Sequence, residues 1–240
     1  MFEKNMDFLT PKEAEKIENT KVAVIGTGAL GQMVTHELVR SGFKDLILMD
    51  PDRMDFSNFN RQLYAAYSVL EQFKAEILAA QMKDIAPDIR LQVYTEFLDG
   101  SNGQKIIAGR DILVDCVDDI LSKLYMEQLA ESLNIPLVHG AVEGWFGQIT
   151  SVYPGDRILS KLYQTKRQQK VTAMAVTVNT IASLQAAEVI KIAIENENIL
   201  RKKVLFVDLW ASDFSYMNLE LNKKEVRRWQ QNMADIWVKF

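Results

Sequence analysis

The sequence predicts an α/β fold: a doubly wound, mostly parallel Rossmann-like sheet with helices on both faces, and a C-terminal extension that contains antiparallel strands. Three observations lead to this prediction. Short apolar runs alternate with segments of helical periodicity from residue 20 to about residue 140. The run KDLILMD (44–50) has too few polar residues for a strand with one face in water, so it suits a buried parallel strand. The first apolar run, KVAVIG (21–26), is followed by a glycine-rich turn and then directly by the helical segment at 31–42.

The N-terminal arm, residues 1–19, and the core, residues 20–146, are predicted from local patterns. In the arm, Thr10 supplies an N-cap, Pro11 a first-turn proline and Glu13 an early acid. In the core, strands are predicted at 21–26, 44–50, 90–97, 111–117 and 135–140, and helices at 31–42, 68–87 and 121–133. The spacing of Ser68 and Glu71 predicts a capping box at the start of the second helix.

The C-terminal extension, residues 147–240, continues the same domain, because no linker separates it from the core. Its predicted elements, in chain order, are a strand and turn at 147–156, a mobile polar crossover at 160–170, a long helix at 171–197, paired strands at 204–210 and 215–221, and a final amphipathic helix. The long helix is apolar on most sides, so we expect it to be buried in the core or in a subunit interface.

Composition excludes several classes of protein. A net charge of −4 and a pI of about 5.4 give no basic footprint for nucleic acid or for an anionic membrane. No apolar run is long enough to span a membrane, and the N-terminus lacks the apolar core of a signal peptide, so we expect a cytoplasmic protein. The chain has one cysteine, Cys116, and two histidines, which makes us expect no structural zinc. Cys116 lies in an apolar run and is expected to pack as a small apolar residue.

The glycine-rich stretch GTGALG (26–31) lies between a predicted strand and a predicted helix. Glycines there let the backbone approach phosphate oxygens, and the start of the helix adds amide donors. Asp50 follows at the end of the next strand, where dinucleotide-binding folds place the acid that binds ribose. Glycine turns also occur for packing, and Asp50 could be a turn residue. At this point an NAD enzyme and an ATP enzyme fit equally well.

Three charged residues favour ATP. Arg61 and Lys74 follow Asp50, and an enzyme that attacks a triphosphate needs such cations, because negative charge moves onto pyrophosphate as the bond breaks. Asp118 lies just past the end of a predicted parallel strand, where a carboxylate can hold Mg²⁺. Each residue has a simpler alternative: a salt bridge for Arg61, a solvated helix face for Lys74, and helix capping for Asp118, which Asp119 or Ser122 could also serve.

These motifs together resemble the ThiF/MoeB/HesA family, the prokaryotic relatives of ubiquitin-activating enzymes. The resemblance runs from about residue 20 to residue 155 and extends more loosely to SLQAAEVIK (183–191). The matching stretches, in order, are GTGALG, Asp50 with Asp52, SNFNRQ (57–62), Lys74, DCVDD (115–119) and GAVEGWFGQIT (140–150). SNFNRQ with the spaced lysine and aspartate is the specific part, whereas the glycine loop alone is not.

The resemblance implies a function and a set of residue roles. Family members use Mg-ATP to adenylate the C-terminal glycine of a ubiquitin-like sulfur-carrier protein, and they are typically homodimers. Asp118 would bind Mg²⁺, Asp50 the ribose hydroxyls, and Phe97 would lie near the adenine. The implied nucleotide-binding set is Gly26, Gly28, Ala29, Gly31, Asp50, Asp52, Ser57, Asn58, Arg61, Gln62, Lys74, Phe97, Asp118 and Asp119. Within it, Arg61, Lys74 and Asp118 would be the catalytic residues.

Several positions depart from the family pattern. Ala29 replaces a usual glycine, and Asp119 a usual asparagine. Before Arg40 the chain has no arginine of the kind that relatives send into the partner subunit's site; one of the lysines at 4, 12 and 16 could substitute, without the bidentate fork of arginine. The CxxC zinc pairs are missing, and residues 141–240 contain no cysteine for a thioester or persulfide step.

Three functions therefore remain open. The leading one is carboxylate adenylation, with either a sulfur-carrier protein or a small carboxylic acid as the acceptor. The second is an NAD-dependent oxidoreductase, which gives SNFNRQ no role. The third is a non-catalytic family member that binds a partner and dimerises through the helix at 171–197.

Overall fold

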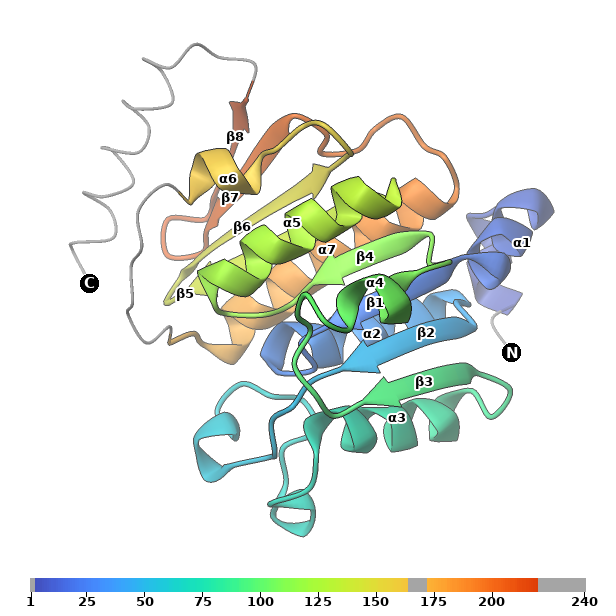
Figure 1. Cartoon of the computed structure of the whole chain (residues 1–240), viewed down its shortest axis with the longest axis vertical. Helices are drawn as coiled ribbons and strands as arrows, with labels where there is room; N and C mark the ends of the chain where they lie inside the picture. Colours follow the sequence, from blue (N-terminus) through green and yellow to red (C-terminus); the bar gives the residue numbers. More distant parts are fainter. Residues whose placement is uncertain (1–2, 164–171, 220–240) are drawn as a thin grey trace.

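The computed structural model, which describes residues 3–163 and 172–219, contains one eight-stranded sheet with the order β3-β2-β1-β4-β5-β6-β7-β8 (Figure 1). The strands are β1 (Lys21–Ile25), β2 (Asp45–Met49), β3 (Arg90–Tyr94), β4 (Ile112–Asp115), β5 (Leu137–Glu143), β6 (Phe146–Val152), β7 (Lys203–Asp208) and β8 (Asp213–Asn218). Strands β1 to β5 pair in parallel, and β6, β7 and β8 add in antiparallel fashion. The predicted fold class, including the antiparallel strands of the extension, is confirmed.

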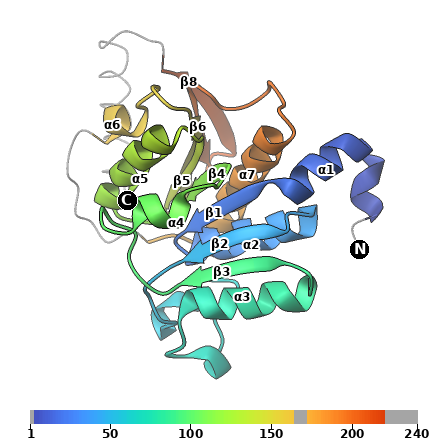
Figure 2. The same ribbon diagram turned by 45° about the vertical axis from the view of Figure 1, so that its right-hand side comes forward.

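Helices cover both faces of the sheet, as Figure 2 shows. One face carries α1 (Pro11–Asn19), α2 (Ala29–Ser41), α3 (Lys74–Ile85) and α7 (Ala175–Ala193). The other face carries α4 (Gly103–Ile107), α5 (Ile120–Leu133) and α6 (Leu159–Leu162). The 3₁₀ helices within the described residues are η1 (Glu3–Asp7), η2 (Phe56–Asn58) and η3 (Tyr67–Val69). Two apolar cores result, one on each side of the sheet.

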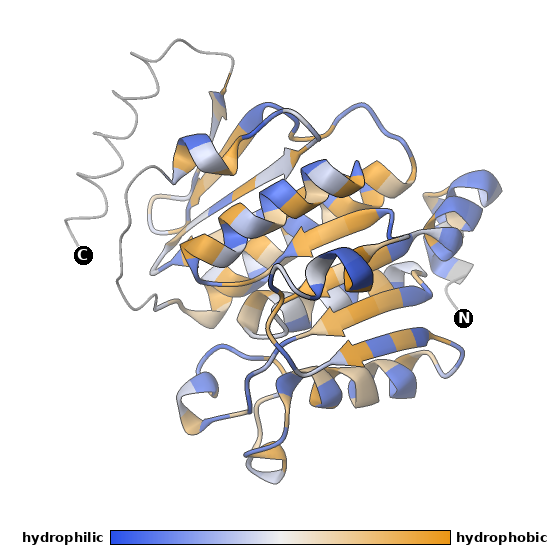
Figure 3. Ribbon diagram, viewed as in Figure 1, coloured by the Kyte–Doolittle hydropathy of each residue, from blue (hydrophilic) through white to orange (hydrophobic). Residues whose placement is uncertain are grey.

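The central strands are apolar because helices bury both of their faces. Residues 22–25 of β1 and all of β4 are buried, and Figure 3 shows these strands as largely hydrophobic ribbons. Strands that are covered on both sides need no polar alternation, which is why they appear in the sequence as continuous apolar runs.

The arm forms α1 as predicted. The Thr10 side chain accepts a hydrogen bond from the Glu13 N–H, and the Glu13 side chain binds the Thr10 N–H, which completes a capping box. Lys16, one of the lysines considered as a substitute for the missing arginine, pairs with Glu195 at 2.5 Å beyond the end of α7. Lys16 therefore forms an ion pair within its own chain.

The predicted start of the helix at 68–87 is wrong. Helix α3 begins at Lys74, after an N-cap residue, Phe73, that makes no side-chain cap hydrogen bond. Ser68 lies in η3, and Glu71 has a positive φ of 63°. The cause is backbone pairing with 53–54: the N–H of Met54 donates to Gln72 O, and the N–H of Glu71 donates to Met54 O. These bonds hold 71–73 out of the helix.

The extension follows the prediction where it is described. The long helix is α7, shorter than the predicted 171–197, and β7 and β8 are the predicted pair. A short helix, α6, occupies the start of the predicted crossover. The rest of the crossover, 164–171, and the predicted C-terminal amphipathic helix lie outside the described residues. Within the described ranges, no helix combines the length and apolar character that a membrane span requires.

Candidate active site

The glycine loop after β1 lies at the edge of the sheet where the parallel strands end. Gly26 has a φ of +86°, and a Cβ atom there would lie 2.6 Å from Cys116 O, in the turn after β4. A Cβ atom at Gly31 would lie 1.8 Å from Gly26 O. At Gly28 the nearest atom to such a Cβ would be Gln62 Nε2, at an ordinary 3.6 Å. Packing therefore requires Gly26 and Gly31, whereas Gly28 leaves room for a ligand.

Helix α2 begins at Ala29 with its first amide groups directed at this edge. Its N-cap, Gly28, has no side chain to accept a hydrogen bond from them. Unpaired N–H groups and the positive end of the helix dipole form a ready site for an anion. Ala29, which replaces the glycine usual in the family, is the first residue of α2, where alanine is compatible with the helix.

Asp50, directly after β2, holds the glycine loop. Its Oδ2 accepts the N–H of Thr27 at 2.6 Å, and its Oδ1 accepts the N–H of Asp52 at 2.9 Å. Burial raises the pKa of Asp50, although the Asp52 N–H and the charge of Lys74 act in the opposite direction. A carboxylate fixed beside the loop is suited to accept further hydrogen bonds from ribose hydroxyls.

Lys74 is buried, not part of a solvated helix face. It is the first residue of α3 and only 6% exposed, and its Nζ lies 2.8 Å from Asp52 Oδ2. The Asp52 side chain is itself 62% exposed. The ammonium group therefore faces outward from the protein interior toward an accessible carboxylate beside the glycine loop.

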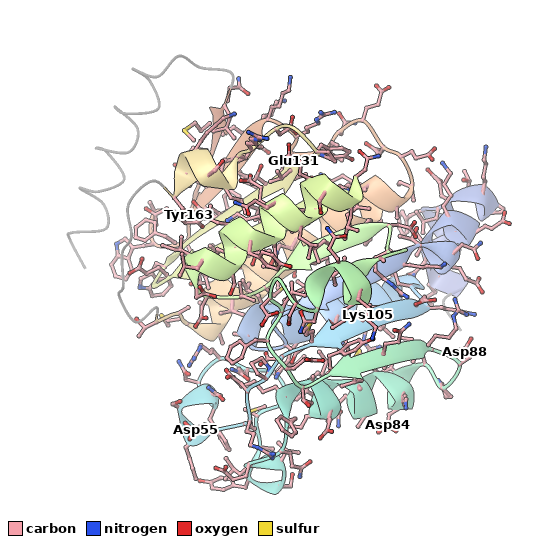
Figure 4. All side chains as sticks on the ribbon, viewed as in Figure 1. Asp55, Asp84, Asp88, Lys105, Glu131 and Tyr163 are labelled. Carbon is pink, nitrogen blue, oxygen red and sulfur yellow. The ribbon has the colours of Figure 1, made fainter. Side chains whose placement is uncertain are left out.

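Arg61 lies on the long excursion between β2 and α3, on which Figure 4 labels Asp55. Its Nη1 donates to Ser57 O at 2.7 Å and to Asn60 Oδ1 at 2.8 Å. Within the described residues it forms no ion pair, so the alternative of a structural salt bridge has no support there. The guanidinium keeps other donors for a ligand.

One buried amide, Asn58, closes a turn within this excursion, and another, Gln62, attaches it to α2. Asn58 Oδ1 accepts the N–H of Asp55 at 3.0 Å, whereas Ser57 is exposed and donates its own N–H to Asp55 Oδ1. Gln62 Oε1 accepts from Gln32 Nε2 of α2 at 3.3 Å. Asn58 and Gln62 thereby have structural roles in addition to their predicted place near the phosphates.

Asp118 and Asp119 follow β4 and have different surroundings. Asp119 Oδ1 accepts the N–H groups of Leu121 and Ser122 at 2.9 and 3.0 Å and so caps α5. Helix capping, the alternative role considered for Asp118, is therefore performed by Asp119. Asp118 is exposed, and its carboxylate accepts no hydrogen bond from the described residues.

A magnesium ion fits a single free carboxylate at this position. Mg²⁺ in nucleotide enzymes is commonly held by one or two carboxylates, with substrate phosphates and water completing the octahedron. The described residues contain no cluster of three or more His, Cys, Asp or Glu side chains that could hold a metal alone. A metal at Asp118 would therefore depend on the nucleotide.

Phe97 lies beyond the end of β3 with 71% of its surface exposed. Its carbonyl oxygen accepts a hydrogen bond from Asn102 Nδ2 at 2.8 Å, which fixes the backbone while the ring remains open to solvent. An exposed ring at the edge where β1 and β2 end is consistent with the predicted position near the adenine.

Hydrogen bonds and ion pairs connect some of the predicted site residues to one another but not others. Direct contacts connect Asp50 with the glycine loop and Lys74 with Asp52, and Gly28 approaches Gln62, the neighbour of Arg61. Across residues 3–163 and 172–219, no hydrogen bond or ion pair joins Arg61 to Lys74 or either of them to Asp118. The convergence of these three residues on one ligand remains a prediction.

A buried polar network behind Asp118 was not predicted from the sequence. Asp115, the last residue of β4, binds Lys123 of α5 and His139 of β5, and all three are at most 3% exposed. A signal was present: Asp115 and His139 each interrupt an apolar strand, and buried ionisable residues need partners.

Cys116 is buried, as predicted. Burial strongly raises the pKa of its thiol, and the nearby Asp115 carboxylate adds to this effect. A buried neutral thiol is a poor nucleophile. The only cysteine of the chain is therefore unsuited to a thioester step.

Comparisons with known proteins find relatives that match most of the chain. The chain is 26% identical over 224 residues to the SAMP-activating enzyme E1 of Haloferax volcanii, covering 90% of this chain and 83% of that protein. It is 29% identical over 215 residues to the molybdopterin-synthase adenylyltransferase of Escherichia coli (strain K12), covering 87% and 86%.

Solved structures share the fold. Escherichia coli MccB, solved with ATP, superposes with a TM-score of 0.75 at 20% identity. The match covers 86% of this chain and 66% of the MccB chain, so this chain spans about two thirds of that protein's length. The model of the ThiF family matches residues 2–228, which is nearly the whole sequence. The chain therefore belongs to the ThiF family.

Proposed function

We propose that this protein is an ATP-dependent adenylyltransferase that activates a carboxylate as an acyl-adenylate and releases pyrophosphate. The observation that carries this proposal is the position of Lys74, a buried lysine whose ammonium group opens beside Asp50, Asp52 and the glycine loop. A lysine in that position serves a polyphosphate better than it serves a nicotinamide cofactor. The names of the relatives as adenylyltransferases and an E1 support the same activity.

Each part of the site has a role in this reaction. The N-terminus of α2 and the open backbone at Gly28 bind phosphate oxygens, and Asp50 binds the ribose. Lys74 and Arg61 neutralise the charge that develops on the leaving pyrophosphate. Asp118 is the residue that would hold Mg²⁺, which when bound would neutralise phosphate charge and orient the triphosphate.

The reaction needs no general base. A carboxylate oxygen of the acceptor attacks the α-phosphorus of ATP, the bond from that phosphorus to the bridging oxygen breaks, and the electron pair leaves with pyrophosphate. An acceptor that is already ionised near pH 7 gives up no proton in this step. The protein contributes mainly position and charge.

We infer that the acceptor is the C-terminal glycine of a ubiquitin-like sulfur-carrier protein. The names of the relatives, a SAMP-activating enzyme and a molybdopterin-synthase adenylyltransferase, support a protein acceptor. A small carboxylic acid is the second candidate, because this chain lacks a reactive cysteine. In both cases the product of this chain is the acyl-adenylate.

We also infer a homodimer, in which the partner subunit completes the site. Within the described part of the arm, Lys16 is engaged by Glu195 of its own chain. Lys4 and Lys12 are exposed; the charge of Lys12 contributes to the lowered pKa of Glu195, and no hydrogen bond or ion pair within the described residues holds either lysine.

Exchange of labelled pyrophosphate into ATP tests the proposal directly. Purified protein with Mg-ATP is offered carrier proteins ending in Gly-Gly, matched carriers that lack the last glycine, and a panel of small carboxylic acids. We expect exchange only with the intact carrier; exchange with a small acid alone would select the second candidate. Nucleotide binding without exchange for any acceptor would contradict catalysis and support a non-catalytic role, and a preference for NAD over ATP would support the oxidoreductase.

A further inference from the structure

The carboxylate of Asp115 joins the end of β4 to the turn that carries Asp118. Its Oδ1 accepts the N–H of Val117 at 3.2 Å, within that turn. Lys123 Nζ lies 3.1 and 3.2 Å from its two oxygens, and His139 Nδ1 lies 2.6 Å from Oδ2. Lys123 also donates to Gly140 O at 3.2 Å, which ties α5 to β5. One buried carboxylate thus connects two strands, a helix and the turn.

The hydrogen-bond chain around His139 has a defined direction. Gln148 Nε2 donates to Tyr163 Oη at 2.6 Å, and the Tyr163 hydroxyl donates to His139 Nε2 at 3.1 Å (Tyr163 is labelled in Figure 4). The proton of neutral His139 must then lie on Nδ1, which donates to Asp115. Burial, together with the charge of Lys123, lowers the pKa of His139 and keeps the imidazole neutral.

The turn between β4 and α5 is held at both ends. At one end Val117 is bound by Asp115, whose carbonyl oxygen in turn accepts from Gln185 Nε2 of α7 at 2.9 Å. At the other end Asp119 caps α5. Asp118 lies between the two anchors, and its carboxylate has no hydrogen bond of its own to the described residues. The position of that carboxylate therefore depends on the anchors.

The adenylation reaction leaves His139 without a chemical task, because no proton is transferred. We propose that Asp115, fixed by Lys123 and His139, is a positioning residue that holds the turn at 116–119 so that Asp118 can bind Mg²⁺. This inference rests on the proposed function for the role of Asp118. Groups hydrogen-bonded to a metal ligand commonly change metal affinity about 10–100-fold when they are replaced, and Asp115 acts one step further out, through the Val117 N–H, so we expect an effect at the lower end of this range.

His139 is the best position for a test. Asp115→Asn would leave the Lys123 ammonium buried without its counter-charge, and we expect it to impair folding. In His139→Asn, Nδ2 takes the place of Nδ1 and can still donate to Asp115. In His139→Leu this donor is lost, while the Asp115–Lys123 pair stays neutral. Ser151→Ala is the control, because it removes one buried hydroxyl that binds Glu188 Oε2 at 2.7 Å, near the opposite edge of the sheet.

The readout is the Mg²⁺ concentration that half-saturates ATP binding, measured by calorimetry without acceptor, on folded fractions verified by thermal unfolding. We expect His139→Leu to raise this concentration about tenfold, with His139→Asn and Ser151→Ala within about twofold of wild type. Wild-type values in both His139 variants would overturn the proposal. So would equal shifts in both, or a shift in Ser151→Ala as large as that in His139→Leu, because the effect would then follow general destabilisation.

Because binding is measured without acceptor, the result is separate from the proposed function. Wild-type protein that binds Mg-ATP but catalyses no pyrophosphate exchange would contradict adenylation and leave the positioning test intact. Wild-type exchange with an unchanged Mg²⁺ requirement in His139→Leu would contradict positioning and leave adenylation intact.

Discussion

Gly28 and Gly31 belong to the same loop but are constrained by different neighbours. Gly31 is pressed against Gly26 O, whereas Gly28 faces the gap toward Gln62. The G-x-G-x-x-G pattern shows where a nucleotide loop lies, but it does not distinguish a glycine required by the fold from one required by the ligand.

Replacing these two glycines by alanine should separate stability from binding. Gly31→Ala is expected to lower the free energy of unfolding by roughly 2 kcal/mol or more, because the backbone must move to admit the methyl group. Gly28→Ala should leave stability nearly unchanged and weaken ATP binding, because the added methyl group occupies the phosphate approach. Urea unfolding and ATP titration check both; equal losses of stability would contradict this assignment.

Asp118 should set the magnesium requirement. Asp118→Asn removes the charge that would hold the metal, so pyrophosphate exchange should fall about 100-fold and need more Mg²⁺. Asp119→Asn is the matched control: asparagine caps helices as well as aspartate does, so we expect unchanged stability and a rate within about tenfold of wild type. A larger loss in Asp119→Asn than in Asp118→Asn would contradict the assignment of the metal to Asp118.

At the scale of elements, the strands and their order of alternation with helices were predictable because burial on both faces leaves continuous apolar runs, as in 44–50. The start of α3 was not predictable from spacing alone. Ser68 and Glu71 have capping-box spacing, but pairing of 71–73 with 53–54 depends on contacts distant in sequence. The Asp115–His139 contact was hidden for the same reason, since nothing local joins a residue of β4 to one of β5.

A charged cluster at the edge of the sheet opposite the site ties neighbouring strands together. Asp45, at the start of β2, pairs with Arg110 at 2.5 Å and with Arg90 of β3 at 3.2 Å. Burial acts to raise the Asp45 pKa, but Arg110 and Arg90 outweigh it and lower the pKa below its ordinary 3.8. The stabilisation is therefore complete above pH 3.8 and is lost as the pH falls through the lowered value.

Asp45→Asn should lower the free energy of unfolding at pH 7 by roughly 1–3 kcal/mol, because the largely buried Arg110 loses its charged partner. The difference from wild type should persist at pH 5 and shrink as the pH falls below 3.8, where the unfolded carboxylate binds a proton, and through the lowered pKa of the folded carboxylate. Urea unfolding across this range measures it, with the exposed Asp84→Asn (Figure 4) as control. Equal stability of wild type and Asp45→Asn at pH 7 would contradict the contribution of this cluster.

For the whole molecule, the family could be predicted from SNFNRQ, Lys74 and DCVDD, because these motifs together are specific; the site that they imply stays a prediction. The buried network of Asp115, Lys123 and His139 could not be predicted, since its members are far apart in the chain. Cys116, the one cysteine of the sequence, is buried with a raised thiol pKa, which does not favour a thioester step at this residue.

The assembly should be a homodimer if a partner subunit completes the site. Sedimentation velocity is expected to give a mass of about twice 27.4 kDa at micromolar concentration. Mixing Lys4→Ala/Lys12→Ala protein with protein inactivated at Asp118 should then restore part of the exchange activity, because one site of the mixed dimer is intact. A monomer with full activity would contradict this arrangement.

The most direct test of triphosphate binding at this site is pyrophosphate exchange by Arg61→Ala and Lys74→Ala, with Arg53→Ala on the same excursion and Lys83→Ala on the same helix as controls. If Arg61 and Lys74 neutralise the leaving pyrophosphate, each alanine variant should lose at least about 100-fold in exchange rate while the controls keep the wild-type rate. Exchange at the wild-type rate in either Arg61→Ala or Lys74→Ala would show that the triphosphate is bound elsewhere.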